Sequence, residues 1–423
     1  MFARGDDVSI QQMMDKFNEF SRSTGLTVNP TKCKIYCGGM KEEDKQTIEQ
    51  ITGFSRGQLP FRYLGIPLQS RKLSNNHCMV IAERIGDRMK HWSTKLLSFA
   101  GRVQLLKSVV FGFASYWMSC LPIPKMVTKK LEAMCRSFLW TGKGEITRKS
   151  PIAWDRVCGP KSNGGLDVIN LEAWNKTCLT KLLWKLASKE DSLWVQWIHK
   201  YYIKSEDVMQ VDIKDNGSWI LRSIFKMRTE VAQLEQWKKL NEQGGFKMKK
   251  LYLDFLEKHP KVEWRGLMIK NYARPRAIFT MWLACHKRLA TKTRLEKFGV
   301  QTDLKCVFCD CPETIQHLLF ECRETKEIWE KVLSWLNMKH KAQRWDQELV
   351  WLTKVCKSRN WRSNIVKVAI AETVCEIWKK RNGHVFQQQY KDSNTAQKII
   401  ELIVNKIWIY PKYMKRIAQM IVE

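Results

Sequence analysis

The sequence predicts a mainly helical chain with a small α+β segment at its N-terminus and a four-ligand Cys/His unit near its C-terminus. Three observations predict this fold class. Apolar residues recur at helical spacing over most of the chain, short extended runs occur only before residue 70, and Cys306, Cys309, His317 and Cys322 lie within 17 residues. With 423 residues and 44% hydrophobic side chains, the chain is long enough for two to four compact units.

The first 70 residues predict one helix followed by extended elements. Apolar residues from Val8 to Phe20 recur at helical spacing, and Asp6 or Asp7 can cap that helix. Residues 25–30 then predict a strand running into a turn, and residues 34–37 a second strand that ends at Gly38. Residues 61–68 predict a third extended element.

Helices are predicted from about residue 80 onward. An apolar stripe predicts a helix from Ile81 to Phe99, with Gly101 breaking it, and further helices span residues 102–118 and 127–140. The uncharged run 108–124 is only 17 residues long and contains Ser, Tyr and Pro, so it predicts a buried helix and no membrane span. A loop at 161–166 precedes a Trp-rich helical region at 171–202. Most tryptophans are expected to be core anchors.

Composition divides the second half of the chain: the Cys/His unit occupies about residues 246–335, and another mostly helical region follows Gln343. Residues 205–250 are polar and contain Gly244-Gly245, which indicates a flexible join.

The Cys/His unit has the spacing C-x2-C-x7-H-x4-C, a donor set that suits tetrahedral zinc. His317 and Cys322 would lie about 140° apart on a regular helix, so Cys322 is expected just past the helix end, with residues 318–320 packing under the site. Four protein ligands leave no position for water, which predicts structural zinc. Two alternatives stay open: Cys311 as a substitute ligand, and a set of reduced, buried cysteines.

The net charge of +31 indicates a polyanionic partner, and nucleic acid (RNA, DNA or both) is the expected one. Basic residues interleave with aromatic residues between Trp264 and Phe298. The candidate phosphate contacts are Arg274, Arg276, Lys287, Arg288 and Lys292. The aromatic residues of this run are instead favoured as core residues, although stacking on bases is the alternative.

No catalytic residue is predicted. Asp6-Asp7 could suggest a two-metal site, but only five residues precede the pair and a helix follows, so these carboxylates are expected to favour a helix N-terminus. No cysteine or serine lies in a recognisable triad motif. The opening residues lack the apolar core of a signal peptide, and the scattered cysteines indicate a reducing compartment, nucleus or cytoplasm.

The order of these motifs resembles the C-terminal part of a plant LINE-type (non-LTR) retrotransposon reverse transcriptase. Residues 25–34 resemble the palm motif that follows the catalytic hairpin, residues 61–68 the primer grip, and residues 92–102 the thumb signature. Residues 163–166 with 174–176 are similar to the connecting region, residues 282–322 to the zinc-binding domain, and residues 377–382 to the tail.

The resemblance implies a palm remnant at 1–70, a thumb-like region at 71–145, a connector at 146–245, a reverse-transcriptase zinc-binding domain at 246–335 and a tail at 336–423. It also implies that the catalytic Ala-Asp-Asp hairpin would lie upstream of Met1, so that this chain is a truncated, non-catalytic remnant that holds zinc and nucleic acid. A piece of a longer active RNA-directed DNA polymerase and a protein-interaction module are the alternatives.

Overall fold

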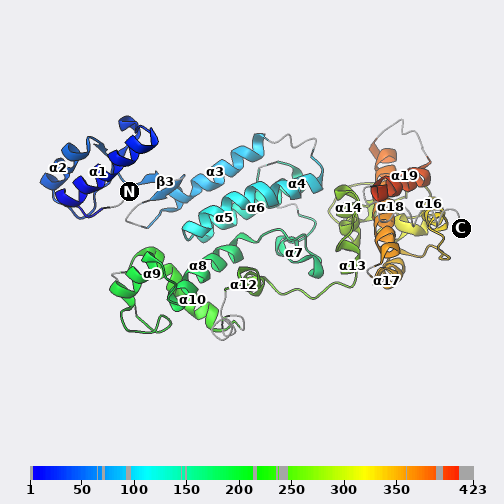
Figure 1. Cartoon of the computed structure of the whole chain (residues 1–423). Helices are drawn as coiled ribbons and strands as arrows, with labels where there is room; N and C mark the ends of the chain where they lie inside the picture. The colour runs from blue at the N-terminus through cyan, green and yellow to red at the C-terminus, as the bar shows by residue number, and fades with distance from the viewer. Residues whose placement is uncertain are drawn as a thin grey trace. The chain divides into compact units, whose positions relative to one another are not determined.

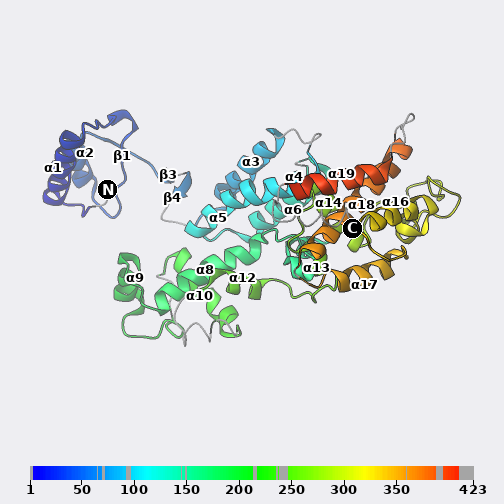
Figure 2. The same ribbon diagram turned by 45° about the vertical axis from the view of Figure 1, so that its right-hand side comes forward.

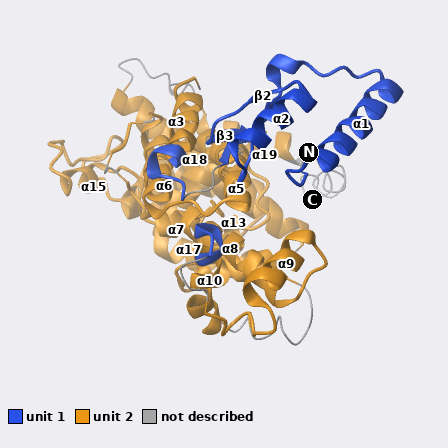
Figure 3. Cartoon of the chain, turned by 90° about the vertical axis from the view of Figure 1, so that its left-hand side faces the viewer, with its two compact units in different colours: residues 1–78, 213–222 blue, residues 79–212, 223–423 orange. Residues whose placement is uncertain are grey.

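The computed structural model describes residues 3–63, 65–68, 72–91, 97–143, 145–147, 150–212, 217–234, 237, 246–358, 360–386 and 394–408. Helices dominate these residues, and the strands among them are short (Figure 1). The chain divides into two compact units. Unit 1 comprises residues 1–78 and 213–222, and unit 2 comprises residues 79–212 and 223–423 (Figure 3).

Unit 1 contains two helices and two small sheets. The helices are α1 (Asp7–Thr24) and α2 (Glu42–Thr52), and a short 3-10 turn, η1, spans Pro30–Lys32. Strands β1 (Lys34–Ile35) and β2 (Ser55–Arg56) pair in parallel, whereas β3 (Phe61–Tyr63) and β4 (Ile66–Leu68) pair antiparallel. Asp6 caps α1 by accepting a hydrogen bond from the Ser9 amide, as its sequence position predicts.

Two predictions for unit 1 are corrected. Residues 25–30 form no strand, because Gly25 ends α1 in the left-handed region (φ 70°) and Pro30 starts η1 with the Asn29 side chain as its cap. The extended element at 61–68 is a hairpin of two strands, with Gly65 at φ 84° between them. The α+β character is confirmed among the described residues, and the assignment to a polymerase palm stays a prediction.

The first half of unit 2 is a group of packed helices. The helix α3 (Asn75–His91) crosses the unit boundary, and a continuous helical run follows as α4 (Phe99–Leu105), the π-helical turn η2 (Leu106–Val110) and α5 (Phe111–Cys120). The helix α6 (Lys125–Thr141) ends at Gly142 in the left-handed region, close to the predicted end at residue 140. Gly101 lies inside α4, so the predicted break there is wrong. The proposed thumb residues 92–96 lie outside the described residues.

The run 108–124 is largely helical and buried, with Phe111, Ala114, Trp117 and Met118 in the core, as predicted. No described helix is both long and apolar enough to cross a membrane.

The middle part of unit 2 begins with a short helix, α7 (Trp154–Cys158), and a 3-10 turn, η3 (Lys161–Asn163). The predicted helical region 171–202 is interrupted: α8 (Leu171–Ala187) ends before Lys189, which has φ 50°, and α9 (Leu193–Ile198) continues into the π-helical turn η4 (His199–Ile203). Next come α10 (Trp219–Ala232), which also crosses the unit boundary, and α12 (Met248–Phe255), which packs on α8. The predicted join at Gly244-Gly245 lies outside the described residues.

The last part of unit 2 surrounds the Cys/His unit. Its elements are α13 (Arg265–Met268), α14 (Pro275–Cys285), α15 (Lys292–Glu296), the turn η5 (His317–Glu321), α16 (Arg323–Trp335), α17 (Trp345–Val355), α18 (Trp361–Phe386) and α19 (Thr395–Trp408). The helix α18 packs against α14, α16 and α19, and Figure 2 shows these helices side by side. Trp282, Trp329 and Trp345 are fully buried here, as predicted for tryptophan anchors. The predicted boundaries at residues 145, 245 and 335 all fall within unit 2.

Candidate metal centre

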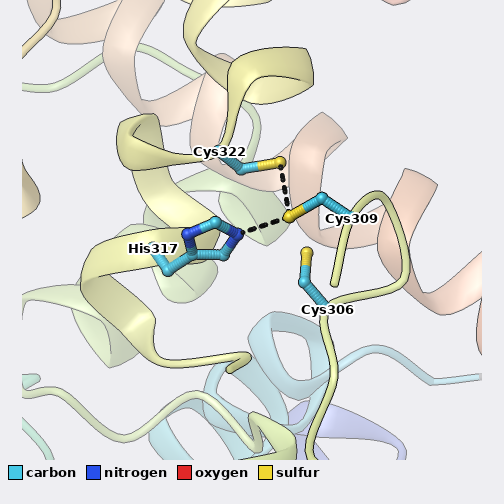
Figure 4. Close-up of side chains that lie close together, drawn as sticks. All are labelled: Cys306, Cys309, His317 and Cys322. Carbon is cyan, nitrogen blue, oxygen red and sulfur yellow. Dashed lines mark hydrogen bonds between the residues drawn. The ribbon is translucent and has the colours of Figure 1, made fainter. Parts of the chain in front are cut away.

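The four predicted ligands meet at one point. Figure 4 shows the side chains of Cys306, Cys309, His317 and Cys322 turned toward one another. The Sγ of Cys309 lies 3.0 Å from Nε2 of His317 and 4.0 Å from Sγ of Cys322, and all four donor atoms lie within 4.8 Å of one another. Around tetrahedral zinc, sulfur atoms are about 3.8 Å apart and sulfur–nitrogen pairs about 3.6 Å apart. Shifts of well under about 1 Å would seat the ion, so this donor set fits zinc.

A tight turn positions the first cysteine pair. An isolated antiparallel bridge joins Lys305 to Pro312, and the Cys306 amide donates to the Cys311 carbonyl oxygen at 2.7 Å. Backbone amides of Phe308 and Cys311 hydrogen-bond to the sulfur atoms of Cys306 and Cys309. These bonds favour the thiolate forms that bind metal. The Cys311 side chain is exposed and does not belong to the cluster, so its predicted substitute role finds no support in the geometry.

A kinked turn positions the second pair. His317 opens η5, whose helical path breaks at Leu319 and at Phe320, which has φ 86°. Cys322 follows in extended backbone (φ −66°, ψ 131°) and occupies the N-cap position of α16. The prediction that Cys322 lies just past a helix end is therefore confirmed. Leu318, Leu319 and Phe320 are buried beneath the site, also as predicted.

The cysteine thiols differ in acidity because of their surroundings. A hydrogen bond from Cys306 lowers the pKa of Cys322, and the backbone amides of Glu324 and Thr325 lower it further. The same hydrogen bond raises the pKa of Cys306, and burial adds to the increase. The pKa of Cys322 is therefore lowered and that of Cys306 raised, chiefly because Cys306 donates the hydrogen bond between them.

The helix α18 supports the metal-binding turn from behind. Glu313 is fully buried, and its carboxylate accepts hydrogen bonds from Nε and Nη2 of Arg381, the latter at 2.6 Å. Lys380 pairs with Glu324 in α16 at 2.5 Å, and its ammonium lies 5.6 Å from the centre of the Phe308 ring. Sequence reasoning missed this support, because single charged residues 68 positions apart carry no local pattern.

The predicted phosphate contacts have different environments. Arg274 forms an ion pair with Glu372 at 2.6 Å and with Glu376 at 2.7 Å, and both carboxylates are buried. Burial raises the pKa of Glu376, but hydrogen bonds from Lys379 and Arg274 outweigh it and lower the pKa to about 2. Arg274 therefore joins α14 to α18.

The other four candidates are more accessible. Arg276 and Arg288 are exposed, and Lys287 is exposed and pairs with Asp346 at 2.7 Å. Lys292 is half-buried, and its ammonium donates to the Lys305 carbonyl oxygen at 2.8 Å. Among the aromatic residues of this run, Phe279 and Trp282 are buried, as the core interpretation predicts, whereas Phe298 is 69% exposed.

The glycine turn at residues 163–166 is hydrogen-bonded to α14 and to His286, the residue that follows α14. The Gly164 carbonyl oxygen accepts hydrogen bonds from Trp282 Nε1 and from His286 Nε2, both at 2.8 Å. Burial lowers the pKa of His286, which favours its neutral form at this contact. A Cβ atom on Gly165 would lie 1.8 Å from the Gly159 carbonyl oxygen, so the close approach requires glycine there.

The described residues contain a second group of potential metal ligands. Asp155, Glu257 and His259 place donor atoms within 4.8 Å of one another. His259 already pairs with Asp155 at 2.9 Å, and Glu257 is exposed. This group joins α7 to the segment after α12.

Comparison with known proteins supports the metal centre. Residues 246–329 match the family described as zinc-binding in reverse transcriptase. The chain is similar to a putative ribonuclease H protein of Arabidopsis thaliana, with 31% identity over 154 residues, 36% of this chain and 25% of that protein. It is also similar to an uncharacterized mitochondrial protein of Arabidopsis thaliana, with 26% identity over 114 residues, 27% of this chain and 74% of that protein.

The chain thus spans a quarter of the length of the first of these relatives. The domain match agrees with the geometry, because the four converging side chains lie within the matched residues. The matches support a chain related to reverse transcriptases, and residues 246–329 are a zinc-binding domain whose Cys3His cluster is able to hold the metal ion.

Proposed function

We propose that this chain is a nucleic-acid-binding part of a LINE-type retrotransposon reverse transcriptase, in which a structural zinc ion organises the binding region. The observation that carries this proposal is the match of residues 246–329 to a reverse-transcriptase zinc-binding family, together with the convergence of its four ligands. The net charge of +31 agrees with a polyanionic partner.

A structural role for zinc follows from the donor set. Three thiolates and one imidazole fill a tetrahedral shell and leave no open position for a reacting water. The residues of this chain then hold the ion, and the ion fixes the turn at 306–311 against the start of α16. We assign no catalytic residue to the chain and propose that it contributes RNA or DNA binding.

Fluorescence anisotropy of the zinc-loaded chain with labelled RNA and DNA tests the proposal. Affinity is expected to fall steeply with salt, because each phosphate contact releases counterions. A chain that binds neither nucleic acid at low salt would refute the proposal. Primer extension by the chain alone would show that it carries polymerase chemistry, contrary to our assignment.

A protein-binding surface is the second candidate function, and one observation favours it. Leu193, Trp197 and Tyr201 on α9 and η4 are 85%, 50% and 58% exposed. Exposed apolar side chains that gather in this way mark protein contacts. Binding through such a surface would change little with salt, which separates it from binding through phosphates.

A further inference from the structure

Arg156 and Arg288 lie close enough to His286 to lower its pKa, and Arg294 lies close to Arg288. The chain reverses at Lys287 (φ 55°), so that the Arg288 amide donates to the Leu283 carbonyl oxygen at 2.8 Å. The Arg294 guanidinium reaches back to the Lys287 carbonyl oxygen at 3.5 Å. Arg156 comes from α7, and its carbonyl oxygen would lie 2.8 Å from a Cβ on Gly165, next to the glycine that His286 contacts.

The charges of these arginines are not compensated by carboxylates among the described residues. Asp155 pairs with His259 at 2.9 Å, and Asp346 pairs with Lys287 at 2.7 Å. Arg156 and Arg288 both lower the pKa of His286 in addition to the larger effect of burial. Burial and the neighbouring Arg288 likewise lower the pKa of Arg294. Such a like-charge cluster is relieved by an anion.

An exposed aromatic ring lies next to the cluster. The Arg294 guanidinium carbon is 5.2 Å from the centre of the Phe298 ring, and Phe298 is 69% exposed. Figure 3 shows α15, which carries Arg294, at the edge of unit 2 in that view. Phosphate-binding cations beside an open aromatic face are the combination that binds unpaired nucleotides, because a base in a duplex has no free face for stacking.

We propose that Arg156, Arg288, Arg294 and Phe298 form a binding site for single-stranded nucleic acid, with the arginines on phosphates and a base stacked on Phe298. This inference rests on the proposed function and deepens it, because it names residues and a single-stranded ligand. Arg156 and Arg294 were not among the phosphate contacts that the sequence predicts, and Phe298 belongs to the aromatic run for which base stacking was the alternative. The shared chemistry is a phosphate chain with unpaired bases, which both RNA and DNA supply.

The test uses the full zinc-loaded chain and four probes. These are labelled oligouridine and oligothymidine of about 15 nucleotides, a size that such sites accommodate, a DNA duplex, and heparin as a polyanion without bases. Phe298→Ala is compared with Phe386→Ala, whose side chain is 77% exposed at the end of α18. Arg288→Gln is compared with Arg22→Gln, which removes the same charge from an exposed position in unit 1. Zinc content and circular dichroism establish that each variant is folded.

Phe298→Ala is expected to weaken single-strand binding about ten-fold and leave heparin and duplex binding unchanged. Arg288→Gln is expected to reduce the salt slope on single strands by about 0.7, the contribution of one phosphate. Whichever single strand binds more tightly, oligouridine or oligothymidine, shows whether the site prefers RNA or DNA. If the wild-type chain binds single strands but Phe298→Ala and Arg288→Gln behave like their controls, this site is refuted and the proposed function stands. If the wild-type chain binds no probe, both this site and the proposed function are refuted.

Discussion

Cys322 differs from the other thiol ligands because its backbone begins a helix. A hydrogen bond from Cys306 is the main cause that lowers the pKa of Cys322, and the backbone amides of Glu324 and Thr325 at the start of α16 add to it. Cys306 and Cys309 depend on amides of a turn that the metal itself would hold in place. Zinc binding would therefore hold the turn at residues 306–311 against the start of α16.

Cys306→Ser together with Cys309→Ser is expected to abolish zinc binding and unfold the metal-binding turn, because structural zinc contributes on the order of 10 kcal/mol to such domains. Zinc content by elemental analysis and the melting transition measure this. Cys311→Ser is the control, since its exposed thiol lies outside the cluster. A double variant with stoichiometric zinc and an unchanged melt would contradict the ligand assignment.

Arg274 and Arg276 show how two residues of one basic run differ in role. Arg274 pairs with the buried Glu372 and Glu376 of α18, and Glu376 also pairs with Lys379 and Lys398. Arg276 is exposed on α14. Arg274→Gln is expected to destabilise the fold by about 3–5 kcal/mol, because it leaves the buried Glu372 carboxylate without its ion-pair partner. Arg276→Gln is expected to change stability by less than about 0.5 kcal/mol. Urea denaturation of both variants measures the difference, and equal midpoints would contradict it.

At the scale of elements, the glycine turn shows how a short motif can hold two helical segments together. Gly164 presents one carbonyl oxygen to Trp282 and His286, and Gly165 allows the backbone to pass against Gly159. The turn thereby holds η3 against α14. A motif with little side-chain chemistry of its own determines where two helical groups meet.

Gly165→Ala is expected to destabilise unit 2 by about 1–3 kcal/mol or more, because the new methyl group would overlap the Gly159 backbone. Gly112→Ala is the matched control. It lies within a continuous helical run with open space around its Cα, and is expected to stabilise by up to about 1 kcal/mol. Thermal and urea unfolding of both variants test this, and the same sign for both would disprove the packing argument.

Local features of the elements were predictable, and those set by distant contacts were not. The Asp6 cap, the Gly142 helix end and the spacing of the zinc ligands are written in a few adjacent residues. The predicted helix break at Gly101 was wrong, because a single glycine costs a helix only about 1 kcal/mol and packing can offset that cost. The role of Arg274 and the support of Glu313 by Arg381 depend on α18, far along the chain.

At the scale of the molecule, α18 connects the metal-binding turn to the rest of unit 2. It is buried on nearly all sides and carries the charged partners of Glu313, Glu324 and Arg274. A helix with this environment is a central core element. The residues after 335 therefore stabilise the zinc-binding domain, although sequence patterns place them in a separate tail.

Arg381→Leu is expected to destabilise unit 2 by about 3–5 kcal/mol and to speed zinc loss to a chelator, because it leaves the Glu313 carboxylate buried and unpaired. Adding Glu313→Met should recover much of the stability, since an apolar pair can replace a buried ion pair. Chelator-induced zinc release and urea unfolding measure both variants. A double variant no more stable than Arg381→Leu would show that the ion pair is not the source of the effect.

The separation of 68 residues between Glu313 and Arg381 has a consequence for synthesis on the ribosome. At about 5–20 residues per second, all four zinc ligands are made some seconds before the arginine that neutralises the carboxylate beside them. During that interval Glu313 has no ionic partner from α18, so the nascent turn must keep this carboxylate hydrated. The four zinc ligands are translated before α18, the helix that packs behind them. Zinc capture during translation would protect the cysteines until α18 has been made.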